Sequence, residues 1–121
     1  MTDRHLLAAN QRAGEVFVAL AEPTRWRLLG LIASRGGGTA TTLAAEVMIS
    51  RPAVVKHLAV LDRAGLVEGR RQGREVRYTV RTEPLATTGR WLTDLAEEWD
   101  RRLTAIKRIA ESAGGSEDEP R

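Results

Sequence analysis

Five arginines lie within twelve positions in the second half of the chain. They are Arg70, Arg71, Arg74, Arg77 and Arg81, and the same stretch holds a single acidic residue, Glu75. A guanidinium group presents a planar fork of donors that pairs with phosphate oxygens, so this density predicts non-covalent binding of a polyanion. The β-prone runs 66–71 and 75–80 flank a tight turn at Gly73 and predict a hairpin, a wing over 66–80. A purely structural hairpin does not need so many cations.

A second group of cations stands at the start of a predicted helix over 51–64. Ser50 is a good N-cap, and Pro52 is tolerated in a first turn because the amides there have no intrahelical partner. The expected buried face is formed by Val54, Leu58 and Leu61. A rotation of about 100° per residue places Lys56 on the opposite face. The helix therefore presents a basic outer surface near its N-terminus.

Residues near the N-terminus of such a helix contact base edges when the helix enters a DNA major groove. Arg51 is suited to guanine and Val55 to a thymine methyl group, and Ser50 can add a phosphate hydrogen bond. His57 lies about 60° from the buried face, which favours a packed or hydrogen-bonded histidine over a base contact. The full set of expected DNA contacts is Ser50, Arg51, Ala53, Val55, Lys56, His57, Arg70, Arg71, Gln72, Arg74 and Arg77. The alternative interpretation is that the charged helix residues form only a solvent-exposed face that binds nothing.

The preceding elements must position this surface. Apolar spacing predicts helices over about 10–21 and from Pro23 to the glycines at 36–38. A third helix, capped by Thr39, Thr41 or Thr42, is expected to hold Glu46 early enough to favour its dipole, and Met48-Ile49 forms the turn. The sequence thus predicts a mainly α fold with a β-hairpin wing: four helices, the hairpin and a fifth helix, a winged helix-turn-helix.

The fifth predicted helix carries a long apolar stripe after Pro84. Its members step by three and four residues, and they are Leu92, Leu95, Trp99, Leu103, Ile106 and Ala110. Such a one-sided stripe predicts a partner helix. Around the domain at 10–111, residues 1–9 are expected to form a frayed or partly helical arm, and the acidic residues 112–121 are expected to be disordered.

Composition narrows the class of protein. The 121 residues fit one domain, and the net charge of +3 becomes +6 once the acidic stretch 111–121 is set aside. The chain has no cysteine, which excludes disulfides and thiolate metal sites within it. No phosphate loop and no nucleophile beside a base is present, so an enzyme is not expected. No apolar run approaches a membrane span and no signal peptide is expected, which predicts a cytoplasmic protein.

In the predicted helix-turn-helix and wing, the sequence resembles the ArsR/SmtB family of winged-helix transcriptional regulators. The segments that carry the resemblance are Ala21–Arg25, Leu43–Glu46, Ser50–Val54 with His57-Leu58, Ala64–Val67 and Gly69–Tyr78. The resemblance implies a homodimeric repressor whose first and last helices form the dimer interface while the fourth helix and wing hold double-stranded operator DNA. The leading hypothesis is that it represses promoters that include its own. The implied interface residues are Val16, Phe17, Leu20, Trp91, Leu92, Leu95, Trp99, Leu103 and Ile106.

The sequence also departs from the metal sensors of that family. It has neither cysteines in the third helix nor histidines in the last one, and the carboxylates around Asp94 to Asp100 are more simply a solvated face beside Arg101. We therefore expect no metal and no cofactor, as in a metal-independent subgroup. The alternatives are a winged-helix protein-interaction module and a repressor controlled by a small molecule near the C-terminal helices, where Trp91 and Trp99 could line a pocket. No effector is identifiable.

Overall fold

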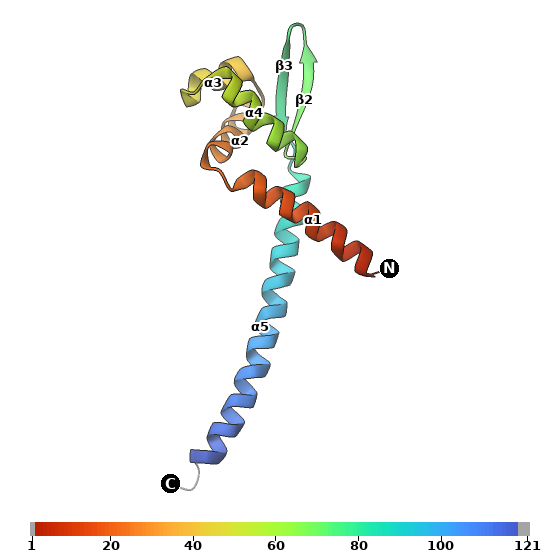
Figure 1. Ribbon diagram of the computed structural model, residues 1–121, viewed down its shortest axis with the longest axis vertical. Coiled ribbons are helices and arrows are strands. Elements are labelled where there is room, and N and C mark those ends of the chain that lie inside the picture. Colours follow the sequence, from red (N-terminus) through yellow and green to blue (C-terminus); the bar gives the residue numbers. More distant parts are fainter. Residues whose placement is uncertain (1, 119–121) are drawn as a thin grey trace. The chain divides into compact units, whose positions relative to one another are not determined.

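In the described part of the chain, the five helices and the β-hairpin follow one another in the expected order, with one additional short strand (Figure 1). The computed structural model describes the backbone of residues 2–118 and the side chains of residues 10–114. The elements are α1 (Thr2–Leu20), α2 (Pro23–Arg35), β1 (Gly38–Thr39), α3 (Ala40–Val47), α4 (Arg51–Arg63), β2 (Val67–Gln72), β3 (Glu75–Val80) and α5 (Glu83–Asp118). The chain divides into two compact units, residues 1–88 and 89–121. The predicted mainly α fold with a β-hairpin wing is confirmed.

The core of the first unit is built where α1, α2, α3, α4 and β2 meet. Its largest fully buried side chains are Leu28, Ile32, Leu43, Leu58, Leu61, Leu66, Val16, Val54 and Val67. The predicted inner face of α4 is therefore correct, since all three of its residues are fully buried. Burying one such side chain contributes roughly 1.5–3 kcal/mol, so this face anchors α4 firmly against the other helices.

One expected interface residue belongs to this core. Val16 is only 2% exposed and packs among the core residues beside Ala19, so it is not available to a partner protomer. Leu20 is partly buried against the same cluster, whereas Phe17 is 39% exposed. The assignment of Val16 to the dimer interface is thus wrong, because the inner face of α1 is already needed to cover the core of its own chain.

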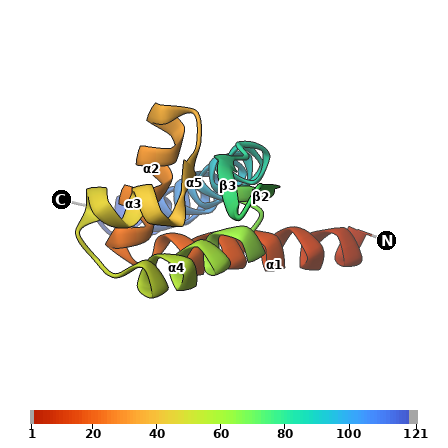
Figure 2. The same ribbon diagram turned by 90° about the horizontal axis from the view of Figure 1, so that it is seen from above.

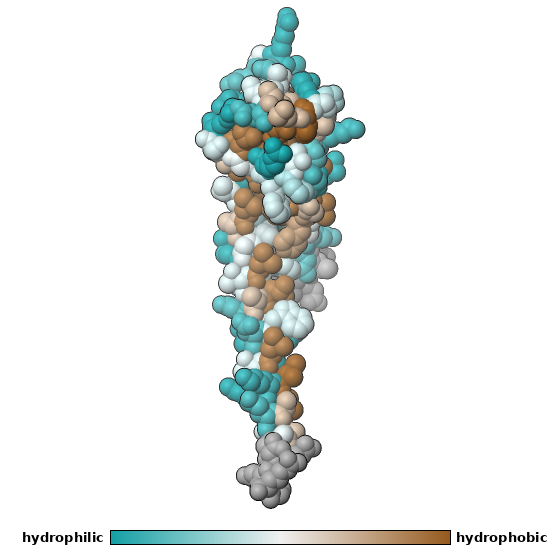
Figure 3. All heavy atoms as spheres, turned by 90° about the vertical axis from the view of Figure 1, so that its left-hand side faces the viewer, coloured by the Kyte–Doolittle hydropathy of each residue, from teal (hydrophilic) through white to brown (hydrophobic). Residues whose placement is uncertain are grey.

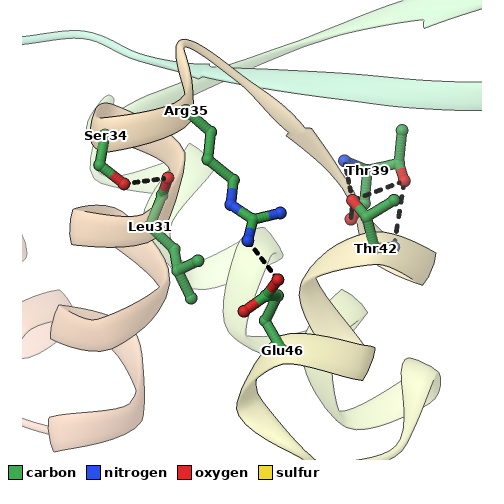
Figure 4. A network of polar contacts seen from close by, with 6 residues as sticks. All are labelled: Leu31, Ser34, Arg35, Thr39, Thr42 and Glu46. Atoms are coloured by element: carbon green, nitrogen blue, oxygen red, sulfur yellow. Dashed lines mark hydrogen bonds and ion pairs between the residues drawn. The ribbon is translucent and has the colours of Figure 1, made fainter.

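The connection from α2 to α3 is held by local polar contacts (Figure 4). Thr39 caps α3: its hydroxyl accepts from the Thr42 amide, and the Thr42 hydroxyl accepts from the Thr39 amide. Glu46 lies at the C-terminal end of α3, so the expected dipole contribution is wrong; its carboxylate instead pairs with Arg35 of α2. These contacts fix the angle at which the chain enters the helix-turn-helix.

A short strand that the sequence analysis did not anticipate precedes α3. β1 pairs with β3, which gives a three-stranded antiparallel sheet in the order β1-β3-β2. Gly36 ends α2 in the left-handed conformation, with φ of 71°, and so turns the chain toward β3. The wing is therefore attached to the body along β3 and not only through its ends.

The long helices include both expected terminal segments. α1 begins at Thr2 and so includes residues 2–9 of the arm that was expected to be frayed or partly helical, whereas α5 continues to Asp118 where disorder was expected from residue 112. Gly114 and Gly115 each disfavour a helix by about 1 kcal/mol relative to alanine, but neither forbids helical backbone. Residues 119–121 of the expected tail lie outside the described residues. No helix in the described part is long and apolar enough to cross a membrane.

Candidate nucleic-acid interface

The N-terminus of α4 is fixed by its cap and by a contact with α3. Ser50 has extended backbone, and its Oγ atom accepts a hydrogen bond from the Ala53 amide at 3.2 Å. Nε of Arg51 lies 3.3 Å from Oγ1 of Thr41. The guanidinium of Arg51 is thus held at the junction of α3 and α4, with its Nη atoms free of any hydrogen bond that the structure records.

The outer face of α4 is open. Arg51 and Lys56 are exposed, Val55 is 39% exposed, and Ala53 is half-buried. Viewed as in Figure 2, α4 runs alongside α1, and the two helices are in contact. A long basic face with apolar Val55 beside it matches what base edges in a major groove require.

His57 lies on a different side of α4 from Lys56. Its ring is half-buried, with Nδ1 3.3 Å from Nη1 of Arg25 and 3.8 Å from Oε2 of Glu22. This placement agrees with the packed, hydrogen-bonded histidine that the sequence analysis favoured. Base contact by His57 gains no support from the arrangement of its neighbours.

The wing ends in a two-residue turn. Gln72 pairs with Glu75 across the strands, and Gly73 takes a positive φ of 62°, as a tight hairpin requires. Arg71, Gln72 and Arg74 are exposed at this tip. Three of the five expected wing contacts thus gather where a backbone phosphate or a minor groove can be reached.

Two wing arginines are engaged with the protein. Nε of Arg70 lies 2.9 Å from Oε2 of Glu68, although the Arg70 side chain remains 83% exposed. Arg77 donates through Nη2 to the carbonyl of Gly36 at 3.3 Å and covers Gly37. Arg77 therefore fastens the wing to the α2–β1 connection, and its assignment as a DNA contact is not supported by this geometry.

Glu68 organises the base of the wing. Its carboxylate meets Arg70 and also Nη1 of Arg81 at 3.1 Å, while Nη2 of Arg81 lies 3.2 Å from Glu83. The hydrogen bond and charge of Arg70, followed by Arg81, lower the pKa of Glu68 against the opposing effect of desolvation. Sequence reasoning missed the Arg81–Glu68 pair and the Arg51–Thr41 contact, because each joins residues ten or more positions apart.

The described part of α5 in the second unit carries a line of exposed apolar side chains (Figure 3). Its large exposed members are Leu92, Trp99, Leu103, Ile106 and Ile109, and Trp99 is 51% exposed. Trp91 and Leu95 are partly buried. The guanidinium of Arg102 lies 5.5 Å from the ring centre of Trp99, a cation–π contact. The stripe predicted from the sequence is present, and Ile109, which was not among its predicted members, is a further exposed apolar residue within its span.

Other kinds of site were sought among the same residues. The described residues contain no group of three or more His, Asp or Glu side chains that could hold a metal ion. A groove of about 680 Å³ opens between α1 and α4, lined by Gln11, Arg12, Glu15, Val18, Val60 and Arg63 among others. This groove lies on the first unit, so it is not at the position near the C-terminal helices where a small molecule was hypothesised to bind. Small-molecule binding near those helices stays a hypothesis.

Known proteins of similar sequence and structure identify the family to which this chain belongs. An ArsR-like transcriptional regulator from Rhodococcus sp. RHA1 has a solved structure that is 43% identical, covers 87% of this chain and 98% of its own, and superposes with a TM-score of 0.78. The chain belongs to the ArsR-like family of transcriptional regulators. A helix-turn-helix domain family also matches residues 20–70 of this ArsR-like chain, which span α2 to the start of the wing.

Two further relatives of the ArsR-like chain are informative. The transcriptional repressor SdpR of Bacillus subtilis (strain 168) is 32% identical over 89 residues, which are 73% of this chain and 97% of SdpR. The winged helix-turn-helix DNA-binding domain of Mb0332 from Mycobacterium bovis is 28% identical, covers 78% of this chain and 84% of its own, and has a TM-score of 0.58. That domain is described as homodimeric.

Proposed function

We propose that this ArsR-like chain is a homodimeric repressor that binds a double-stranded DNA operator, with α4 in the major groove and the wing on the phosphate backbone or in the minor groove. The observation that carries the proposal is the exposed basic N-terminus of α4 together with the exposed arginines at the tip of the hairpin whose strand β2 contacts α4. SdpR, a relative over nearly its whole length, is named a transcriptional repressor, which supports repression here.

Each contact residue has a role in the proposal. Arg51 contacts a guanine, Val55 meets a thymine methyl group, and Lys56 supplies positive charge within the groove. Ser50 adds a phosphate hydrogen bond, and Ala53 lies next to these residues in the first turn of α4. Arg71, Gln72 and Arg74 contact the neighbouring backbone from the wing tip, and Arg70 joins them when it leaves Glu68.

The proposed dimer is formed through α5 and the exposed Phe17 of α1. The apolar stripe of α5 would otherwise face water along several helical turns, and Trp99 is large enough to anchor an interface. A two-fold dimer presents two α4 helices and so reads two half-sites separated by about one helical turn of DNA, roughly 34 Å. The homodimeric Mb0332 domain supports this assembly.

The repressor is further proposed to act without a metal, without a catalytic step and in the cytoplasm. The donor set supports the first point, because the sequence has no cysteine and its last helix has no histidine, the residues that bind transition metals most readily. The small number of histidines and the absence of a nucleophile paired with a base support the second.

The proposal is tested by titrating the purified chain against the DNA upstream of its own gene. We expect a retarded complex whose apparent Kd is at least about a thousand-fold below that for a scrambled duplex of equal length at the same salt concentration. Equal binding to both duplexes would contradict an autorepressor with a specific operator. A chain that binds neither duplex would instead favour the protein-interaction module.

A further inference from the structure

A cluster of three polar side chains joins the recognition helix α4 to the helices before it. Nε of Arg25 donates to the carbonyl of Ala19 and Nη2 donates to that of Val18 at 3.1 Å, while Nη1 lies 3.3 Å from Nδ1 of His57. A single guanidinium therefore connects the last turn of α1 with the middle of α4. The cluster can therefore influence the position of α4 without contacting DNA itself.

The third member of the cluster is the carboxylate of Glu22, one of whose oxygens has no recorded hydrogen-bond partner. Oε2 of Glu22 is buried and has no hydrogen-bond partner, and it lies 3.8 Å from Nδ1 of His57. Burial works to raise the pKa of Glu22, but the amide and hydroxyl of Thr24 and the charge of His57 outweigh it and lower that pKa. Glu22 is consequently ionised throughout the range in which a histidine changes its charge.

The same nitrogen of His57 thus faces a donor and an acceptor. In the neutral ring with the proton on Nε2, Nδ1 accepts from Arg25. In the imidazolium ion, Nδ1 carries a proton, so it is repelled by Arg25 and attracted to Glu22. A hydrogen bond to Glu22 then requires the 3.8 Å separation to shorten by about 1 Å, and His57 can move only with α4 or by turning its ring.

We propose that His57 is a proton-sensitive positioning residue: when neutral it holds α4 through Arg25 in the position that fits the operator, and when protonated it turns to Glu22 and shifts α4 away from that position. The inference rests on the proposed DNA-binding function and adds a regulatory input to it. His57 acts here through the helix and not by contact with a base.

The surroundings of the ring support this assignment. Among the described residues, the recorded charged groups facing the ring are Arg25 on α2 and Glu22 immediately before it, and α1 contributes only backbone carbonyls through Arg25. On α4 itself, the neighbouring Lys56 is exposed on another face. Nδ1 of His57 therefore faces one cation and one anion, and both lie outside α4.

The test is a pH series of DNA affinity measured by fluorescence anisotropy. The probe is a duplex that the wild-type chain selects from a random pool at pH 7.5, with a scrambled duplex as reference. Between pH 7.5 and pH 5.5 we expect the ratio of specific to scrambled affinity to fall about tenfold, comparable to the loss of one base contact. His57→Asn keeps an amide near the position of Nδ1 but does not titrate, so its ratio should stay level across the series.

Two further variants separate positioning from general effects. The chain has only one other histidine, and His5→Asn should retain the wild-type pH profile. Glu22→Gln removes the charge that favours the imidazolium ion, so the midpoint of the profile should move to lower pH while the fold is checked by thermal melting.

The possible results are distinct. A wild-type ratio that does not change with pH, or a His57→Asn profile that follows the wild type, would overturn the inference. A wild-type chain that selects no sequence from the pool would contradict the proposed function itself, and with it the inference.

Discussion

Arg70 and Arg77 are direct partners across the wing, yet their guanidinium groups turn to different neighbours. Arg70 meets Glu68 on its own strand, whereas Arg77 reaches the carbonyl of Gly36 in the connection between α2 and β1. Like charges placed opposite each other in a sheet are destabilising, and these two contacts offset that cost. The wing therefore contains arginines that stabilise it and, at its tip, arginines that are left for a ligand.

This division predicts different effects of two kinds of arginine substitution. Arg71→Ala and Arg74→Ala should each lower the slope of log affinity against log salt by about 0.9, the value for one phosphate contact in B-DNA. Arg77→Ala should lower Tm and leave the slope nearly unchanged. The measurements are anisotropy titrations across a salt series and thermal melts. A lower slope for Arg77→Ala with an unaltered Tm would show that Arg77 contacts DNA.

The ion pairs of Glu68 predict a pH-dependent contribution to stability. Its pKa in the folded chain is below the ordinary value of 4.5, so the stabilisation is complete above that value and is lost as the pH falls through the lower folded pKa. Glu68→Gln should therefore reduce Tm at pH 7, and the difference from wild type should narrow below about pH 4.5. Glu75→Gln is the matched control, since no ion pair to Glu75 is recorded among the described residues. A Tm difference that is independent of pH would contradict the account.

The turn of the helix-turn-helix stores backbone strain at Met48. This residue has φ of 58° and ψ of 44°, and its side chain is 88% exposed, so no packing offsets the left-handed conformation. The left-handed conformation costs about 1–2 kcal/mol for a residue with a Cβ atom, and a glycine at this position would not have that cost. Glycine also has more conformational freedom in the unfolded chain, which destabilises the folded state by about 0.5–1 kcal/mol and so cancels part of the gain. Met48→Gly should thus raise the free energy of unfolding by about 0.5 kcal/mol, or Tm by about 3 °C. Met48→Leu should leave Tm unchanged, and destabilisation by glycine would refute the strain.

The charge order along α5 predicts how two copies pair. Acidic residues cluster from Asp94 to Asp100 and basic residues from Arg101 to Arg108, so an antiparallel pair places opposite charges together and a parallel pair opposes like charges. Because the chain lacks cysteine, Leu92→Cys and Ile109→Cys report the arrangement by oxidation. A mixture of the two variants should form the mixed disulfide. Disulfides only between identical variants would indicate a parallel pair, and a monomer in sedimentation would contradict the dimer.

What the sequence revealed about α4 came from local rules. The spacing of Val54, Leu58 and Leu61 defines a helix face whatever lies against it, and Ser50 caps the helix through an amide only three residues away. The position of the recognition surface followed from these two facts. The turn at Gly73 was predictable for the same reason.

The sequence-based predictions failed where the structure depends on contacts between residues that are far apart in the sequence. An apolar residue such as Val16 suits a core and an interface equally well, and only the packing of α1 on its own chain decides between them. β1 is two residues long and exists because β3 pairs with it. Arg77 finds its carbonyl partner 41 positions away, a contact that no pattern of neighbouring residues indicates.

The most direct test of the central claim is a base-by-base scan of the selected duplex with the wild-type chain and Arg51→Ala. We expect the wild type to lose about 1–3 kcal/mol of binding free energy when one particular G·C pair is changed, and Arg51→Ala to be indifferent to that pair while still discriminating at the others. If Arg51→Ala instead weakens binding equally to every duplex, including a scrambled one, Arg51 does not contact a base, and α4 does not read the operator in the way proposed.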